Sequence, residues 1–461
     1  MNVINRVRTV GTRLRDDGPA ETLRRSARML ARRAGAAMDW DDLDFPLREE
    51  DIASPGTAGQ PDETPRHSGP LTIGWVCSPP AAGSGGHTTL FRMVEAMERR
   101  GHECVVLLYE RGSDDTVRHE PVLRRAWPGM KAQIASATGD LSRFDAIVAS
   151  AWASAHVVAS RSAGAARRYY FIQDYEPHFY PRGYLYSLAE STYRFGFDNI
   201  ALGRMVAHEL RTQSGVEPEI VVPFGCDRDT YRRLSGREGE RPRSGVVYYA
   251  KRSVDRRGYA LARAALERFH ELCPDEPIHV IGDEVRGWRA PIINHGSMRP
   301  AELNALYNET IAGLAMSFTN VSLVPGELLA AGTVPVLNDS ADARRDMESA
   351  GAVWAEPTPE ALARALADVV SVDPEETAAR AAVTALSAPP GWERTQAAVA
   401  DFIEARHRPL TSVPSGEDSL LTAEQRHPHM GRGGAPTEAY TVRAPHNGTA
   451  AGRGSTHLGQ L

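Results

Sequence analysis

Short apolar runs alternate with amphipathic stretches along most of the chain, and this alternation gives the first indication of the fold. The apolar run Leu71–Cys77 is followed by a loop of small residues and then by helical periodicity from about Thr88 to Arg100. The apolar face of that stretch consists of Leu90, Phe91, Val94 and Met97. A second apolar run, Cys104–Tyr109, follows a few residues later. Strand, loop, helix and strand in this order predict a βαβ unit with parallel strands.

The alternation continues in two groups of strands, which the polar, glycine-broken segment Ser235–Ser244 separates. The other strands expected in the first group are Ala146–Ala149, Tyr169–Ile172, Asn199–Leu202 and Ile220–Val222. Those of the second group are Val246–Ala250, Ile278–Ile281, Ile292–Asn294, Gly313–Met316, Val334–Leu337 and Ala352–Trp354. Helical patterns between strands include Arg204–Ser214, Tyr259–Leu272, Pro300–Asn308 and Pro359–Val370. We therefore expect an α/β protein with two Rossmann-like, doubly wound parallel sheets.

The pattern divides the chain into five parts. We assign residues 69–240 to an N-terminal Rossmann-like domain and 241–395 to a C-terminal one. A late helix, about Trp392–Ala405, is expected to cross back onto the first domain, so that 396–408 form a return segment. Residues 1–68 are expected to form a basic helix and a linker, and 409–461, which are poor in bulky apolar residues, a disordered tail.

The first 36 residues are rich in arginine and leave two interpretations open. Leu23, Ala27, Leu30 and Ala34 fall at helical spacing, with arginines on the other side. Such a helix can lie on an anionic membrane surface, or it can dock on the catalytic body of its own chain.

Composition limits the class of protein. The net charge of −6 gives no extended basic face, so we expect no nucleic-acid partner. The four cysteines are far apart and form no CxxC pair, which argues against a zinc site and against disulfides. No run approaches 18 apolar residues and no signal-peptide core follows Met1, so we expect a cytoplasmic protein, with peripheral contact at the inner membrane face left open.

The stretch Ser317–Leu337 carries the first candidate site. It reads as a strand end, a polar loop and a short helix that begins near Glu327, ends at Gly332 and precedes a new apolar strand. A loop that enters a helix N-terminus offers backbone N–H groups and a positive dipole end, which suits a phosphorylated or polyhydroxylated ligand. An ordinary strand, loop and capped helix is the alternative for this stretch alone.

Two further loops follow predicted strands. Ala250–Gly258 carries four cations, Lys251, Arg252, Arg256 and Arg257, and could clamp a diphosphate or be a solvated charged loop. The loop Gly83–His87 is rich in glycine but is not GxGxxG, so it supports a dinucleotide cofactor only weakly.

Together these pieces resemble a glycosyltransferase of the GT-B architecture, in particular the retaining family 4, over residues 70–405. Gly85-Gly86-His87 and Arg100-Gly101-His102-Glu103 resemble that family's amino-terminal glycine loop and its RGHEV segment. Val222–Asp227 resembles the turn that closes its first domain. Arg252 and Arg257 occupy the places of the family's diphosphate-binding cations, and Glu327 that of the second glutamate of its E-x7-E motif, which holds the nucleotide ribose.

Three departures narrow the resemblance. Thr319 stands where E-x7-E has its first glutamate, Arg257 replaces a lysine, and Gln173-Asp174 replaces a His-Asp pair. These departures, and the run Phe171–Tyr180, resemble the WsaF-like rhamnosyltransferases of bacterial surface glycan assembly. That group implies dTDP-β-L-rhamnose as co-substrate, no cofactor, and a growing glycan, which could be lipid-linked, as acceptor.

The resemblance implies a role for each site residue. The donor would be held by Arg252, Arg257, Thr319, Asn320, Ser322, Leu323, Val324 and Glu327. The acceptor would lie near Gly85, Gly86, His87, Gln173 and Tyr175. Asp174, Glu176 and His87 are the candidates for handling the acceptor's proton, and Arg252 for neutralising the leaving diphosphate. No DxD-like pair lies in these loops, so we expect metal-independent transfer and no metal ligands in the site.

Three other functions remain open on the sequence alone. The chain could use a UDP- or GDP-sugar on the same fold. It could be a non-catalytic carbohydrate-binding relative, because the first glutamate is missing. It could also be an NAD-dependent oxidoreductase on two Rossmann-like domains, although GxGxxG is absent.

Overall fold

The computed structural model describes residues 45–56, 69–81, 83–162, 166–234, 242–347 and 349–408. All of them belong to one compact unit, Met1–Pro409. The predicted basic helix at 1–36 and the predicted tail at 409–461 lie outside the described residues.

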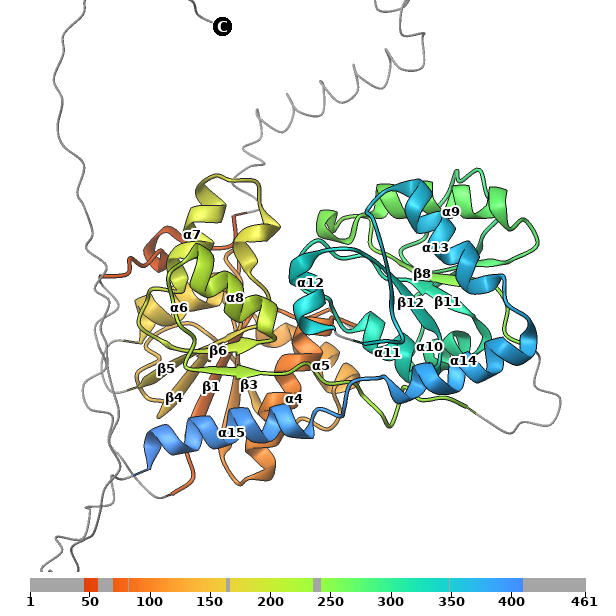
Figure 1. Cartoon of the computed structure of the whole chain (residues 1–461). Coiled ribbons are helices and arrows are strands. Elements are labelled where there is room, and N and C mark those ends of the chain that lie inside the picture. Colours follow the sequence, from red (N-terminus) through yellow and green to blue (C-terminus); the bar gives the residue numbers. More distant parts are fainter. Residues whose placement is uncertain are drawn as a thin grey trace, which may run out of the picture. The chain divides into compact units, whose positions relative to one another are not determined.

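Two parallel sheets, each covered by helices, form this unit (Figure 1). The first sheet has the order β3-β2-β1-β4-β5-β6-β7. Its strands are β1 Thr72–Cys77, β2 Glu103–Leu108, β3 Gln133–Ser136, β4 Ala146–Ala149, β5 Arg167–Ile172, β6 Asp198–Leu202 and β7 Ile220–Val222. Its helices are α4 Gly85–Arg99, α5 Glu120–Ala126, α6 Trp152–Arg161, α7 Tyr184–Thr192 and α8 Arg204–Gln213, with 3-10 turns η1 Glu49–Asp51, η2 Val117–His119 and η3 Glu176–Phe179.

The second sheet has the order β10-β9-β8-β11-β12-β13. Its strands are β8 Val246–Ala250, β9 Ile278–Gly282, β10 Ile293–Gly296, β11 Ala312–Leu314, β12 Val334–Asn338 and β13 Val353–Ala355. The helices after β7 are α9 Tyr259–Leu272, α10 Pro300–Glu309, α11 Val324–Ala331, α12 Ala341–Asp346, α13 Pro359–Val370, α14 Pro374–Leu386 and α15 Glu393–His407, with the 3-10 turn η4 Asp255–Arg257. The predicted fold class, two doubly wound parallel sheets, is confirmed.

Both faces of each sheet are buried, which explains why the strands read as continuous apolar runs. In β1, Ile73 and Trp75 face one core and Val76 faces the other. In β8, Tyr248 faces one core of the second domain and Val247 faces the other. Strand order reverses between β1 and β4 in the first sheet and between β8 and β11 in the second. In such sheets, ligands bind at these switch points, beyond the carboxyl ends of the strands.

The last helix, α15, packs on the first sheet (Figure 1), as the sequence predicted. Trp392, Val399 and Ile403 belong to the same core as β1 and α4. At the rim, Arg100 donates to Asp401 over 2.7 Å. The final helix therefore belongs to the first domain, although the second domain precedes it in the chain.

Several elements were not predicted. The edge strand β3 contains a single bulky apolar residue, Ile134, and so lacks the apolar run that marked the other strands. Helix α6 is rich in small residues and gives a weak periodic signal. Helix α4 begins at Gly85, so that the predicted glycine loop is partly its first turn. None of the helices among the described residues is long and apolar enough to cross a membrane.

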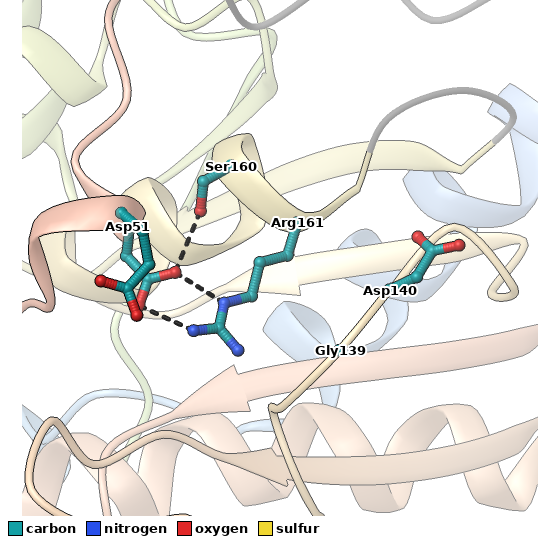
Figure 2. Close-up of a pocket in the computed structure, with 6 residues that line it drawn as sticks. Asp51, Gly139, Asp140, Ser160 and Arg161 are labelled. Atoms are coloured by element: carbon teal, nitrogen blue, oxygen red, sulfur yellow. Dashed lines mark hydrogen bonds and ion pairs between the residues drawn. The ribbon is translucent and has the colours of Figure 1, made fainter.

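Residues 45–56, inside the predicted linker, are instead packed against the first domain. Leu47 is fully buried in the core beneath β2 and β4. Asp51 is 1% exposed and forms an ion pair with Arg161, whose Nε and Nη2 lie 2.6 and 2.9 Å from its two carboxylate oxygens (Figure 2). Tyr109 donates its hydroxyl to the same carboxylate. A cavity of about 440 Å³ opens beside this pair.

We expect Asp51→Ala to lower the free energy of unfolding by about 3 kcal/mol or more, because it leaves the Arg161 guanidinium without its buried partner. Urea denaturation measures this loss, and limited proteolysis should cut residues 45–56 faster. Glu49→Ala is the matched control, since Glu49 is exposed on the same turn. Equal unfolding midpoints for Asp51→Ala and the unchanged chain would contradict this account of the segment.

Candidate functional site

Two loops of the second sheet meet at its switch point. One, Lys251–Gly258, follows β8, and the other, Ala315–Leu323, follows β11. The Arg256 carbonyl accepts from the Phe318 amide over 2.9 Å. Gly258 has a φ of +60° and leaves no room for a side chain, because a Cβ would lie 2.8 Å from the Phe318 ring. The basic loop and the polar stretch therefore form one surface.

Arg257 ties the two loops together. Its guanidinium donates to the Ser317 hydroxyl over 2.5 Å and approaches the Asn320 carbonyl at 3.5 Å. Burial lowers the pKa of Arg257 to about 10, and the neighbouring Arg256 contributes to the same shift. At neutral pH the side chain is still charged, so it places a fixed cation beneath the polar loop.

Arg252 lies at the exposed end of the same loop. Its guanidinium carbon lies 5.9 Å from the centre of the Tyr259 ring, and its amide donates to Asp283 over 2.7 Å. The structure therefore gives the two predicted phosphate-binding arginines different settings: Arg257 is held by the protein, and Arg252 faces solvent.

The entrance of α11 has the geometry of an anion-binding helix N-terminus. Ser322 has a φ of +63°, the only positive value of a non-glycine residue among those that the structure describes. This residue turns the chain immediately before Leu323, the N-cap of α11. The Leu323 carbonyl accepts from the Glu327 amide over 3.1 Å, which starts the helix. A turn of this kind directs backbone N–H groups outward at the positive end of the helix dipole.

Glu327 in the first turn of α11 is a largely buried carboxylate. Burial raises its pKa to about 7, and the negative charge of Asp227 adds to this shift while Arg92 opposes it. Within the described part of the chain, no hydrogen bond or ion pair holds its carboxylate. Its oxygens are therefore free to accept hydrogen bonds from the hydroxyls of a ligand.

The loop after β5 in the first domain reaches these loops directly. Asp174 is 4% exposed, and its Oδ2 accepts from the Thr319 hydroxyl over 2.8 Å. Asn320 donates its side-chain amide to the Gln173 carbonyl over 2.8 Å. Burial raises the pKa of Asp174, whereas the Thr319 hydrogen bond and the positive charge of Arg257 lower it. The hydroxyl of Thr319 thus joins the loop after β11 to a carboxylate of the first domain.

Arg256 also crosses between the domains, and the resemblance did not select it. Its guanidinium carbon lies 4.0 Å from the centre of the Phe179 ring, and its Nε is 3.9 Å from Asp174 Oδ2. That buried Nε has no hydrogen-bond partner among the described residues. The cluster of four cations was the signal that could have found it.

The glycines at the start of α4 line the same region. A Cβ on Gly85 would lie 3.6 Å from the Leu323 side chain, and one on Gly86 would lie 3.7 Å from the Gln173 amide oxygen. The structure thus brings the predicted acceptor residues Gly85, Gly86 and Gln173 next to the predicted donor residue Leu323.

Glu176 is placed differently from the other candidates. Its Oε2 accepts from the Trp152 amide at the N-terminus of α6 and from the Tyr170 hydroxyl. Its own amide donates to the Tyr193 hydroxyl over 3.0 Å. Burial raises its pKa to about 8. These contacts give Glu176 a structural task, the capping of a buried helix end.

The polar atoms of His87 and Tyr175 are likewise close to partners within the protein. The two ring nitrogens of His87 lie 2.8 Å from the Ser84 hydroxyl and 3.0 Å from the Ser78 carbonyl. Burial lowers the pKa of His87. Tyr175 is fully buried, and its hydroxyl lies 2.9 Å from that of Ser214. In this conformation, neither side chain offers a free group to a ligand.

Comparison with known proteins identifies a similar family, a relative and similar folds. Residues 131–204, which include Gln173 and Asp174, match the family model described as WsaF, N-terminal domain. The O-antigen biosynthesis protein RfbC of Myxococcus xanthus is 30% identical over 299 residues. That match covers 62% of this chain but only 23% of the relative.

Two solved structures show the same fold. The Anabaena protein HepE, in complex with UDP and glucose, superposes with a TM-score of 0.55 at 15% identity, over 73% of this chain and 100% of the other. Sucrose-phosphate synthase from Thermosynechococcus elongatus gives 0.53 at 13% identity, over 73% and 98%. The fold is therefore GT-B, as the resemblance predicted.

We expect Glu327→Gln to stabilise the fold at neutral and alkaline pH. Because the pKa of Glu327 is about 7 in the folded protein against 4.5 ordinarily, the folded protein binds this proton more tightly than the unfolded chain does. The stabilisation from this proton is complete below about pH 4.5 and is lost as the pH rises through 7. Glutamine mimics the protonated form, so the variant should gain about 1–3 kcal/mol at pH 8 and almost nothing at pH 4.5.

Urea denaturation at the two pH values measures this difference. Glu356→Gln, an exposed carboxylate of the same domain, is the control and should change neither value. A gain that is the same at both pH values would contradict the assignment of a raised pKa to Glu327.

Proposed function

We propose that this protein is a glycosyltransferase of surface glycan assembly that transfers a sugar from a nucleotide diphosphate donor. The observation that carries the proposal is the contact of Asp174 with Thr319 beside Arg257. This contact brings a carboxylate of the first domain to the loop that would hold the donor's phosphates and sugar. The similarity to RfbC, an O-antigen biosynthesis protein, supports a role in surface glycan assembly.

The donor would bind mainly to the second domain. Arg257 and Arg252 would neutralise the diphosphate, the first as a fixed cation and the second by folding in from solvent. The backbone N–H groups at Ser322–Val324 would contact the phosphate or the sugar. Glu327, whose carboxylate has no partner among the described residues, would accept from the ribose hydroxyls.

Transfer would break the bond between the sugar's anomeric carbon and the diphosphate oxygen and form a bond from that carbon to an acceptor oxygen. The leaving diphosphate takes the electron pair of the broken bond, and the arginines stabilise its charge without a metal ion. Asp174 is the best-placed group to orient the acceptor hydroxyl and take its proton, since burial raises its pKa and it lies between both domains. Glu176 and His87 are less suited, because both are bonded within the first domain, whereas Asp174 lies at the contact with the loop of the second domain.

For the sugar, we propose L-rhamnose from dTDP-β-L-rhamnose. A 6-deoxyhexose has fewer hydroxyls, and Thr319 in place of a glutamate avoids leaving an unpaired buried carboxylate. The hydroxyl of Thr319 is already bonded to Asp174, which is consistent with a smaller demand from the donor. Residues 131–204 of the first domain match the WsaF model, and the donor loops of the second domain lie outside that match.

A donor panel tests the proposal. We expect the chain to release dTDP from dTDP-β-L-rhamnose in the presence of a rhamnose-terminated acceptor, and to do so far more slowly with UDP-glucose or GDP-mannose. Transfer from another nucleotide sugar would replace the proposed donor. Nucleotide-sugar binding without any product would indicate a non-catalytic relative, and thermal stabilisation by NAD alone would indicate an oxidoreductase.

Two substitutions separate binding from chemistry. Asp174→Asn should lower kcat by a factor of about 100 or more while leaving the dTDP affinity within about twofold. Glu327→Ala should instead weaken dTDP binding about tenfold, through the loss of the ribose contacts. Calorimetric titration and initial rates measure both, with Glu356→Ala as an exposed control. Full activity of Asp174→Asn would remove Asp174 from the chemistry.

A further inference from the structure

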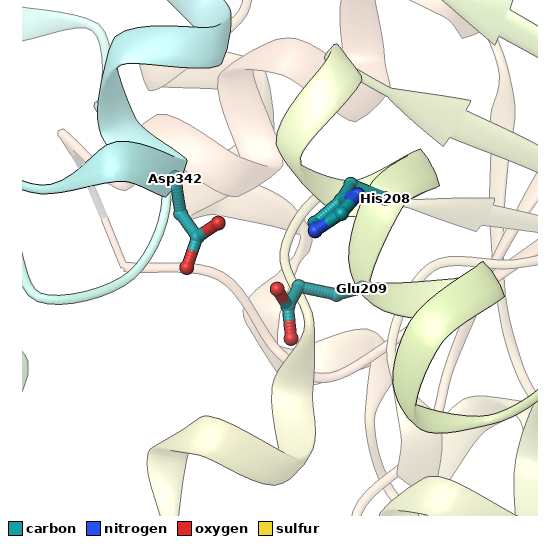
Figure 3. A group of neighbouring side chains, drawn as sticks. All are labelled: His208, Glu209 and Asp342. Atoms are coloured by element: carbon teal, nitrogen blue, oxygen red, sulfur yellow. The ribbon is translucent and has the colours of Figure 1, made fainter.

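A second contact between the domains, away from the loops described above, gathers metal-ligating side chains. His208 and Glu209 lie on α8, and Asp342 lies on α12, which faces that helix (Figure 3). One potential ligand atom of each lies within 4.8 Å of the others. Within the described ranges, this is the only group of three or more His, Cys, Asp or Glu side chains so arranged.

Glu209 is the least satisfied member of the group. It is 4% exposed, and His178 Nε2 lies 3.8 Å from its Oε2. That distance is too long for a hydrogen bond, and no hydrogen bond reaches its carboxylate from any described residue. Burial and the negative charge of Asp342 raise the pKa of Glu209. The carboxylate oxygens of Glu209 are therefore available to a cation.

His208 lies against the guanidinium of Arg345. Arg345 Nη2 lies 3.2 Å from His208 Nε2. A guanidinium can only donate, so a hydrogen bond between these two atoms uses the Nε2 lone pair, which is the lone pair that a metal ion would take. Arg345 also lies 3.4 Å from Asp342 Oδ1 through its Nε. It therefore occupies the position of a counter-cation, and its side chain, 40% exposed, can leave.

The site spans two domains that α12 already joins by another contact. The Asp346 carboxylate accepts from the amides of Arg204 and Met205, the latter over 3.3 Å, and so caps the first turn of α8. Gly203 before this turn has no space for a side chain, since a Cβ would lie 2.6 Å from Asp346 Oδ2. This cap fixes the register of α12 against α8 and holds the ligand group at short range.

We propose that His208, Glu209 and Asp342 bind one divalent transition-metal ion of the Zn²⁺ or Mn²⁺ class, which replaces Arg345 and clamps the two domains. Such ions lie about 2.0–2.2 Å from nitrogen and oxygen ligands, so two ligand atoms on one ion lie at most about 4.4 Å apart. The ligand atoms of this group, which lie within 4.8 Å of one another, must therefore move closer together to share an ion. An imidazole with two carboxylates favours these ions over Mg²⁺ or Ca²⁺, which prefer oxygen ligands. His178 lies close enough to Glu209 to become a fourth ligand.

The ion holds α8 to α12 and takes no part in sugar transfer. The proposal is therefore independent of the proposed function and is tested without any nucleotide sugar. Arg345 is predicted to act as a competitor, which distinguishes a metal site from an ion-pair network that merely joins two helices.

Calorimetric titration of the full chain with ZnCl₂ and MnCl₂ alone tests the site, using protein freed of metal by a chelator and carrying no histidine tag. One equivalent of ion should bind. His208→Ala, Glu209→Gln and Asp342→Asn should each weaken binding about tenfold or more, since even outer-shell changes cost that much. Arg345→Gln should tighten binding, a gain that unfolding cannot produce.

His295→Asn is the matched control. His295 and His279 lie outside the proposed site and have ring nitrogens 3.0 Å apart. Replacing His295 should therefore leave the metal affinity unchanged. Zinc binding of unchanged affinity in Asp342→Asn, or loss of binding in His295→Asn, would overturn the proposal. So would the absence of stoichiometric binding in both the unchanged chain and Arg345→Gln, with circular dichroism confirming that each variant is folded.

Discussion

The hydrogen bond from Thr319 to Asp174 is the contact on which the arrangement of the candidate site depends. It joins two loops that lie 145 residues apart in sequence and belong to different sheets. Both loops follow the carboxyl ends of parallel strands, where the backbone leaves the sheet and side chains are free to face a ligand. Because Asp174 is buried, the hydroxyl of Thr319 and the nearby arginines compensate a charge that would otherwise be unfavourable there. Loss of any of these groups would disturb the site loops of both domains.

The site also distributes its charges unevenly. Arg257 is fixed beneath the polar loop, Arg256 stacks on Phe179 of the other domain, and Arg252 remains in solvent. A fixed cation reduces the reorganisation needed when negative charge develops, whereas an exposed one can adjust to ligands of different size. Glu327 has no partner among the described residues, and its buried charge is therefore unfavourable until a ligand binds.

The sequence predicted the strands of both sheets well because burial on both faces produces continuous apolar runs. It missed β3, which has only Ile134 as a bulky apolar residue, and it treated residues 45–56 as linker although Asp51 anchors them. A single buried ion pair leaves no periodic signal, so pattern analysis cannot detect it. Residue types and loop positions predicted that Asp174, Thr319 and Arg257 belong to one site, but not that Asp174 contacts Thr319 directly. The task of Glu176 depends on the end of α6, a helix that the sequence signalled only weakly.

Because α15 returns to the first sheet, the two domains are connected by two chain segments. The chain passes between the domains twice, near Gly225 and near Trp392, and the two passages are fastened side by side. The Cys226 amide donates to the Pro390 carbonyl over 2.9 Å, and the Thr395 hydroxyl donates to the Pro223 carbonyl over 2.6 Å. A Cβ on Gly225 would lie 2.8 Å from the Trp392 ring, so the passages pack without a gap. Because the two crossings are bonded to each other, a movement of one domain relative to the other must bend both passages together.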